Sequence, residues 1–150
     1  MANILNEDFQ DFLLAFNKAQ VKYVLVGGYS VIYHGFPRTT GDLDLFVEVS
    51  EQNYEHITEA FLAFGMPVFD MTKNNFLENS NLNVFSFGRP PVSIEILKEI
   101  TGLSFGEVYT AAVSAELEGV SVKIINLEHL KQNKQQSGRH KDLNDLENLP

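Results

Sequence analysis

The fold is decided by residues 23–48, which read YVLVGGYSVIYHGFPRTTGDLDLFVE. Residues 24–26 form an apolar run typical of a strand, which the pair Gly27 and Gly28 ends. Residues 29–34 then fit a short helix. Residues 42–48 alternate between polar and apolar side chains, as in a second strand. The stretch therefore predicts a strand, a glycine turn, a short helix and another strand.

Two aspartates, Asp42 and Asp44, begin the second strand fourteen residues after the glycine pair. Because residues i and i+2 of a strand share a face, both carboxylates project the same way, while the leucines between and after them point into a core. Two parallel carboxylates repel each other unless a cation lies between them, and hard oxygen ligands suit Mg²⁺ or Mn²⁺. The spacing therefore predicts a metal site, with an acidic rim at the start of a strand as the alternative.

The glycine turn has a use beside such a site. Gly27 and Gly28 would allow the backbone to approach phosphate oxygens closely, and Ser30 could add a hydroxyl contact. The alternative is simply a tight strand-to-helix turn. The stretch has neither the second glycine of a serine-hydrolase elbow nor the G-x-G-x-x-G of a dinucleotide site. Together these parts favour handling of a nucleoside triphosphate.

This order of motifs resembles the nucleotidyltransferase superfamily that includes DNA polymerase beta, in which glycines precede a D-x-D strand. Residues 92–105 are similar to the family's third-carboxylate strand and the loop that follows it. Residues 127–149 are similar to the C-terminal helix pair of small bacterial members, which include the toxins of type IV abortive-infection systems. The resemblance implies an α+β fold, α/β-like in its layering, with a mixed β-sheet flanked by helices and a C-terminal helix pair.

Glu95 is the candidate third carboxylate. It shares a strand face with Ser93, while Val92, Ile94 and Ile96 face the other way. The resemblance implies that Glu95 completes the metal site or assists deprotonation of the acceptor. The family more often has aspartate here, and the alternative is an exposed strand glutamate.

Several cations are candidates for the triphosphate. Arg38 precedes the D-x-D strand and would either reach a phosphate or pair with a neighbouring carboxylate. Four of the eleven lysines and arginines fall between residues 131 and 141. Of these, the resemblance implies that Lys134 and Arg139 line the triphosphate site, whereas a solvated helical face is the usual reading of such a run.

The last helix carries both acidic and apolar residues. Asp142 and Asp145 would orient the cations or merely decorate the helix, and three leucines would form its buried side, namely Leu143, Leu146 and Leu149.

Other segments complete the expected sheet. Asn6 starts a helix with aromatic residues at helical spacing, and Ser50 starts another that ends at Gly65. The remaining expected elements are a short strand at residues 68–71, strands at 82–87 and 92–97, a short helix after Ser104, a hairpin of residues 112–117 and 120–125, and two helices after Asn126.

Composition limits the class of protein. The 150 residues fit one nucleotidyltransferase domain spanning residues 1–150. No apolar run approaches the roughly 20 residues that span a bilayer, and no cysteine is present, so we expect a cytoplasmic protein without a membrane partner. The net charge of −9 argues against a broad surface for duplex DNA, but it is compatible with one nucleotide held by metal ions.

The resemblance implies that a nucleoside monophosphate passes from an NTP to a hydroxyl acceptor with Mg²⁺ or Mn²⁺ as cofactor. The acceptor stays open between RNA such as tRNA, a protein and a small molecule, and a partner protein or a homodimer would complete its pocket. Two alternatives also stay open. One is a nucleotide-binding or interaction module that has lost catalysis, and the other is an antibiotic-modifying nucleotidyltransferase.

Overall fold

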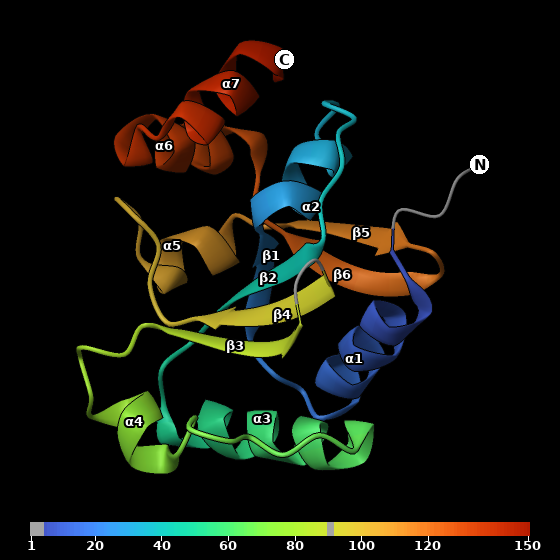
Figure 1. Cartoon of the computed structure of the whole chain (residues 1–150), viewed down its shortest axis with the longest axis vertical. Helices are drawn as coiled ribbons and strands as arrows, with labels where there is room; N and C mark the ends of the chain where they lie inside the picture. Colours follow the sequence, from blue (N-terminus) through green and yellow to red (C-terminus); the bar gives the residue numbers. More distant parts are fainter. Residues whose placement is uncertain (1–4, 90–91) are drawn as a thin grey trace.

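The computed structural model describes residues 5–89 and 92–150, which form a mixed β-sheet with helices on both sides (Figure 1). Its helices are α1 (Glu7–Lys18), α2 (Gly27–Tyr33), α3 (Glu51–Phe64), α4 (Lys73–Leu77), α5 (Phe105–Thr110), α6 (Leu127–Ser137) and α7 (His140–Asn148). Its strands are β1 (Tyr23–Val26), β2 (Asp42–Val47), β3 (Val84–Arg89), β4 (Val92–Leu97), β5 (Val113–Leu117) and β6 (Val120–Ile124). The α+β class expected from the sequence is confirmed.

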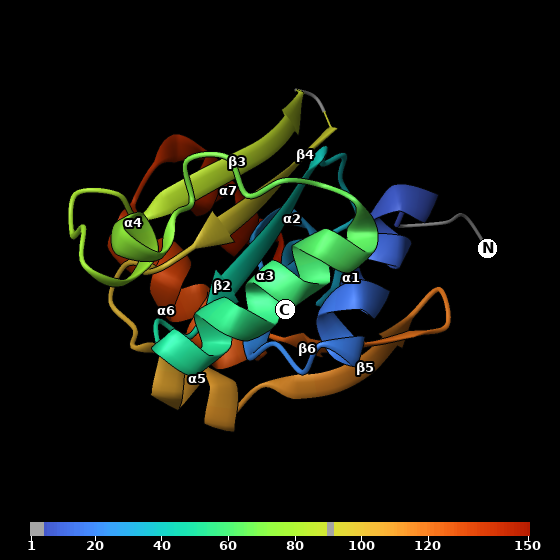
Figure 2. The ribbon, with the colours of Figure 1, turned by 90° about the horizontal axis from the view of Figure 1, so that it is seen from below.

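The sheet order is β3-β4-β2-β1-β6-β5. Strand β2 lies parallel to β4 and antiparallel to β1, and β1 lies parallel to β6. Figures 1 and 2 place α1 and α3 on one side of the sheet, and α2, α6 and α7 on the other. The strand that carries the aspartate pair is therefore held in the middle of the sheet, where both of its edges are hydrogen-bonded.

The helices α1 and α3 have the capping residues that the sequence predicts. The Asn6 side chain accepts a hydrogen bond of 2.8 Å from the Phe9 backbone N–H, which satisfies a donor that the first turn of α1 leaves free. The apolar face of α1 then packs on α3, where the rings of Phe12 and Phe61 meet edge to face with centroids 5.4 Å apart. Helix α3 ends at Gly65, whose φ of 88° lies in the left-handed region.

The strand expected at residues 68–71 was wrong. Met71 is fully buried, and its carbonyl accepts a hydrogen bond of 2.9 Å from the Tyr54 hydroxyl rather than from a neighbouring strand. Thr72 then caps α4, a helix that the sequence pattern did not indicate. Within this segment Met71 is buried and Val68 is partly buried, whereas Phe69 is 67% exposed, so the apolar spacing does not correspond to the alternation of a strand.

None of the helices in residues 5–89 and 92–150 is both long and apolar enough to cross a bilayer.

Candidate active site

Three carboxylates meet on one face of the sheet. Residue Asp42 lies opposite Ser93 and Asp44 lies opposite Glu95 in the parallel pairing of β2 with β4. Because side chains of one strand alternate between faces, Asp42, Asp44 and Glu95 all project toward the side that α6 and α7 cover. They line a cleft of about 620 Å³.

Burial and the neighbouring carboxylates change the proton affinity of Asp44. The pKa of Asp44 is raised to about 7, chiefly by burial, then by the charge of Glu95, by a hydrogen bond with Glu95 and by the charge of Asp42. Lys141 acts in the opposite direction and lowers it. The site therefore concentrates negative charge in a partly dry position, where a cation or a proton is needed to offset the repulsion.

Ser93 is a site residue to which the sequence analysis gave no role. Its hydroxyl donates a hydrogen bond of 2.6 Å to Asp42 Oδ1, and Ser93 itself is buried. The bond fixes one carboxylate oxygen of Asp42 against β4. The signal in the sequence was the two-residue spacing from Glu95, which places both side chains on the same face.

The glycine turn packs directly against the aspartate strand. Gly27 has a φ of 69°, and a Cβ at this position would overlap Asp44 Oδ2. A Cβ at Gly28 would overlap the Thr40 hydroxyl. Both glycines are therefore required by close approach, which also leaves the turn beside the carboxylates without side chains to obstruct a ligand.

Ser30 has a structural use within this turn. Its hydroxyl donates a hydrogen bond of 2.6 Å to the Gly27 carbonyl, and the residue is fully buried. The hydroxyl proton that was predicted to contact a nucleotide is thus engaged by the turn itself.

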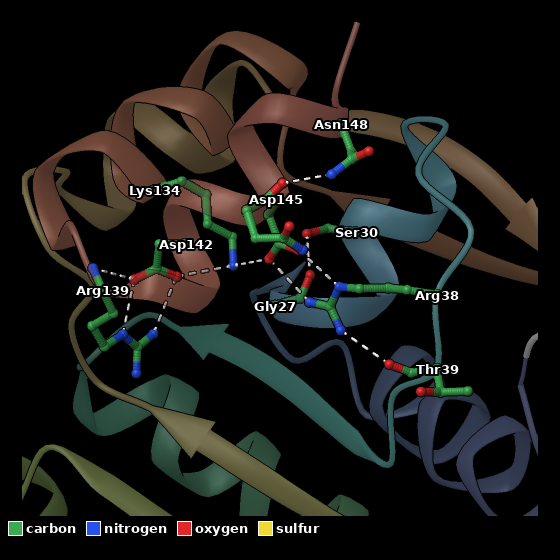
Figure 3. A network of polar contacts seen from close by, with 10 residues as sticks. Gly27, Ser30, Arg38, Thr39, Lys134, Arg139, Asp142, Asp145 and Asn148 are labelled. Atoms are coloured by element: carbon green, nitrogen blue, oxygen red, sulfur yellow. Dashed lines mark hydrogen bonds and ion pairs between the residues drawn. The ribbon is translucent and has the colours of Figure 1, made fainter.

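Arg38 and Lys134 pair with carboxylates of α7 (Figure 3). Arg38 binds Asp145 through two nitrogens, with Nε–Oδ1 of 2.9 Å and Nη2–Oδ2 of 3.1 Å. Lys134 Nζ lies 2.9 Å from Asp145 Oδ2 and 3.2 Å from Asp142 Oδ1. Of the two uses predicted for Arg38, the structure shows the pairing. Lys134 borders the cleft, but its ammonium is occupied.

The last helix buries two aspartates, and the expected apolar side is confirmed only in part: Leu149 is buried and Leu146 is partly buried, but Leu143 is not. Leu143 is 45% exposed, whereas the side chains of Asp142 and Asp145 are each 1% exposed. Burial alone would raise the pKa of each aspartate, but hydrogen bonds and charges from the cations around them lower it overall. The helix therefore docks through ion pairs as well as through Leu149, and Lys134 belongs to this interior and not to a solvated face.

Arg139 and Lys141 are the cations of the cleft wall whose side chains reach solvent. The Arg139 side chain is 73% exposed, and its Nε donates a hydrogen bond of 2.8 Å to Asp142 Oδ2. This bond raises the pKa of the Arg139 guanidinium, with a smaller contribution from Asp44. Both cations thus lie within the electrostatic influence of Asp44, where they could receive an anionic ligand.

The donor chemistry fits a divalent cation. Three carboxylates on two neighbouring strands are the hard oxygen ligands that Mg²⁺ and Mn²⁺ prefer, and the raised pKa of Asp44 shows the charge that a cation would offset. Among residues 5–89 and 92–150, however, no three acidic or histidine side chains stand in a ready-made metal-binding arrangement. One carboxylate oxygen of Asp42 is engaged by Ser93, and Glu95 accepts a hydrogen bond of 3.4 Å from the Ser86 hydroxyl.

Known proteins similar to this chain also carry descriptions that name nucleotidyl transfer. Residues 6–150 match the family model described as "Nucleotidyl transferase of unknown function (DUF2204)". No curated protein matches the chain. Among solved structures, an antigenic nucleotidyltransferase-like protein from Paracoccidioides brasiliensis aligns with a TM-score of 0.52 and 16% identity, over 96% of this chain and 76% of that chain. At this identity the likeness shows a shared fold.

Proposed function

The chain belongs to the family of nucleotidyl transferases of unknown function, and from this premise we propose that it moves a nucleoside monophosphate from an NTP to a hydroxyl acceptor with the help of Mg²⁺ or Mn²⁺. The observation that carries the proposal is the meeting of Asp42, Asp44 and Glu95 on one sheet face, opposite the exposed cations of α7. A site of this kind can hold a metal at one wall and phosphates at the other.

The carboxylates would hold the ion. Asp42 and Asp44 are the proposed ligands, and Glu95 either completes the set or accepts the proton of the acceptor hydroxyl. When bound, the ion would supply positive charge to the triphosphate and to the attacking oxygen. Because the pKa of Asp44 is raised, metal binding would release the proton that Asp44 holds near neutral pH.

The opposite wall would hold the phosphates. Arg139 and Lys141 present exposed cationic ends to the cleft, and a charge-assisted hydrogen bond to a phosphate oxygen is about twice as strong as a neutral one. The turn at Gly27 and Gly28 brings bare backbone beside Asp44. These groups would orient the α-phosphate toward the acceptor, and pyrophosphate would leave.

The best rival is a nucleotide-binding module that has lost catalysis. It is favoured by one observation: the residue opposite Asp44 on β4 is Glu95, one methylene longer than the aspartate more usual in the superfamily. Such a module would bind a metal–nucleotide complex without releasing pyrophosphate. Retention of both strand aspartates favours the enzyme.

The test is transfer from labelled nucleotides. The protein, Mg²⁺ and a cell extract would be incubated with each NTP labelled at the α-phosphate or, separately, at the γ-phosphate. The proposal predicts that the α-label appears on RNA, a protein or a small molecule, while the γ-label leaves as pyrophosphate. The three acceptor classes separate by nuclease, protease and size. The type IV toxin resemblance makes tRNA the first acceptor to examine, and antibiotics are added to cover that subclass.

Matched substitutions give this assay its controls. Asp44→Asn should abolish transfer, whereas Asp70→Asn, the same change at an exposed position outside the cleft, should leave it intact. Equal transfer by both variants, or label from the γ-phosphate on the acceptor, would contradict the assignment. Metal-dependent NTP binding without any transfer would favour the inactive module.

A further inference from the structure

Five charged side chains form a continuous chain that leads from the loop before β2 into the cleft (Figure 3). Their order is Arg38, Asp145, Lys134, Asp142 and Arg139, with contacts of 2.9 Å, 2.9 Å, 3.2 Å and 2.8 Å between successive members. Positive and negative charges alternate, so each interior member is attracted from two sides.

The chain is buried at its middle members and exposed at its Arg139 end. The two aspartate side chains are 1% exposed, Lys134 is 6% exposed and Arg38 is 16% exposed, whereas Arg139 is 73% exposed and borders the cleft. Arg139 is therefore the member that can meet a ligand. The other four are placed to determine where it lies.

Helix α7 depends on this chain for its position. The buried residues between its ends are Asp142 and Asp145, and Arg139 stands immediately before its first residue. Because both residues that α7 buries between its ends are held by ion pairs, a change at Asp145 would be transmitted to Arg139, six residues earlier at the N-cap of this short helix.

Arg38 holds α7 to the loop before β2, beside the glycine turn. Its guanidinium grips both oxygens of Asp145, which fixes direction as well as distance. The same guanidinium donates to the Thr39 carbonyl, and its Nη1 lies 3.2 Å from where a Cβ on Gly28 would stand. One side chain thus joins α7 to the loop that leads into the aspartate strand, next to the glycine turn.

We infer that Arg38 is a positioning residue, which acts through Asp145 and α7 to hold Arg139 where it binds the triphosphate. The inference rests on the proposed function for the ligand, and it assigns Arg38 no contact with that ligand. Of the two uses predicted for Arg38, it accounts for the one that the structure shows, the pairing of its guanidinium with a carboxylate on α7.

The first measurement is calorimetric binding of Mg²⁺ with an NTP analogue whose α–β bridging oxygen is replaced by methylene, so that no transfer occurs. Arg139→Ala should weaken binding about tenfold, since it removes a charge-assisted contact. Arg38→Gln and Arg38→Lys should each weaken it by roughly threefold or more, because lysine keeps the charge but loses the two-point grip. The double variant Arg38→Gln with Arg139→Ala should bind like Arg139→Ala alone.

The control is Lys73→Gln, which breaks an exposed ion pair with Glu51 far from the cleft and should bind like wild type. Two results would overturn the inference: Arg38→Gln that binds like wild type, or effects of Arg38 and Arg139 that multiply in the double variant. Multiplied effects would mean that Arg38 meets the ligand itself.

A second readout needs no ligand. If wild type binds no NTP, the proposed function fails, and this readout still tests whether Arg38 determines the position of Arg139. The sequence holds three arginines, so the Nε–H signals of Arg38, Arg89 and Arg139 are resolvable by nitrogen-15 NMR. The Arg139 Nε–H, which donates to Asp142, should exchange with water faster in Arg38→Lys, while Lys73→Gln leaves it unchanged. An unaltered Arg139 signal in a folded Arg38→Lys protein would overturn the inference.

Discussion

Replacing Lys134 by methionine should destabilise the protein, although most lysines lie on surfaces and are replaced at little cost. The ammonium lies 2.9 Å from Asp145 Oδ2 and 3.2 Å from Asp142 Oδ1, with the side chain 6% exposed. Methionine fills a similar volume without charge, so the change isolates the loss of the cation.

The magnitude follows from the burial of the partners. Removing one member of a buried ion pair typically costs about 3–5 kcal/mol, because the other charge is left uncompensated. Here Asp145 keeps Arg38 and Asp142 keeps Arg139, so we expect the lower end, about 3 kcal/mol. For a domain of this size that corresponds to a fall in melting temperature of roughly 6–12 °C.

The pH dependence gives a second check. In the folded wild type the pKa of Asp142 and of Asp145 is lowered overall, so their ionised forms add stability above the unfolded value of about 4, and this is lost as pH falls through the lower folded value. Without Lys134 both pKa values should rise, and protonation then removes the uncompensated charge. The difference between wild type and Lys134→Met should therefore shrink from pH 7 to pH 3.

Urea unfolding followed by circular dichroism at both pH values measures this directly. Lys73→Met, which removes a cation from an exposed ion pair, is the control and should unfold almost like wild type. A Lys134→Met protein whose free energy of unfolding in urea lies within about 0.5 kcal/mol of wild type at pH 7 would refute the structural role of this lysine.

Three further predictions concern the cleft. Without metal, Asp44→Asn should have a higher melting temperature than wild type at pH 8, and the difference should be smaller at pH 5. The reason is that a carboxyl whose pKa is raised to about 7 lowers the stability of the fold as pH rises from about 4 to 7. Scanning calorimetry at both pH values checks this, and a lower melting temperature of Asp44→Asn at pH 8 would contradict it. Gly27→Ala should lose more stability in urea unfolding than Gly65→Ala, since both have positive φ but a Cβ collides with neighbouring atoms only at Gly27; equal losses would deny the close approach. Lys141→Ala should weaken calorimetric NTP binding by about tenfold with little change in melting temperature, whereas Lys18→Ala should do neither, and unchanged binding would remove Lys141 from the phosphate wall.

Local patterns in the sequence predicted several elements of the fold. Alternation in residues 42–48 placed Asp42 and Asp44 on one face, and the structure brings Glu95 onto the same face through the pairing of β2 with β4. Helix α1 was predictable because its cap and its aromatic spacing both lie within a few turns of chain. Such features depend only on residues that are close together in the sequence, so the sequence alone can predict them.

The buried ion pairs were not predictable in this way. Arg38 and Asp145 are 107 residues apart, and no local pattern says that they meet. Charged residues on a helix are usually solvated, so Lys134 was assigned either to the triphosphate or to a solvated face, and Leu143 to the interior. Once partners from two other segments surround them, the aspartates of α7 are the residues that it buries.

The most direct test of the account is the melting temperature of the protein with Mg²⁺ and each NTP, together and separately. If Asp42, Asp44 and Glu95 form a metal–nucleotide site, the pair should raise the melting temperature more than either component alone. A ligand at about 100 times its dissociation constant adds roughly 2.7 kcal/mol, which corresponds to several degrees here. The increase should disappear in Asp44→Asn and persist in Asp70→Asn. No shift with any of the four NTPs at millimolar levels, with either Mg²⁺ or Mn²⁺, would contradict both the enzyme and the nucleotide-binding module.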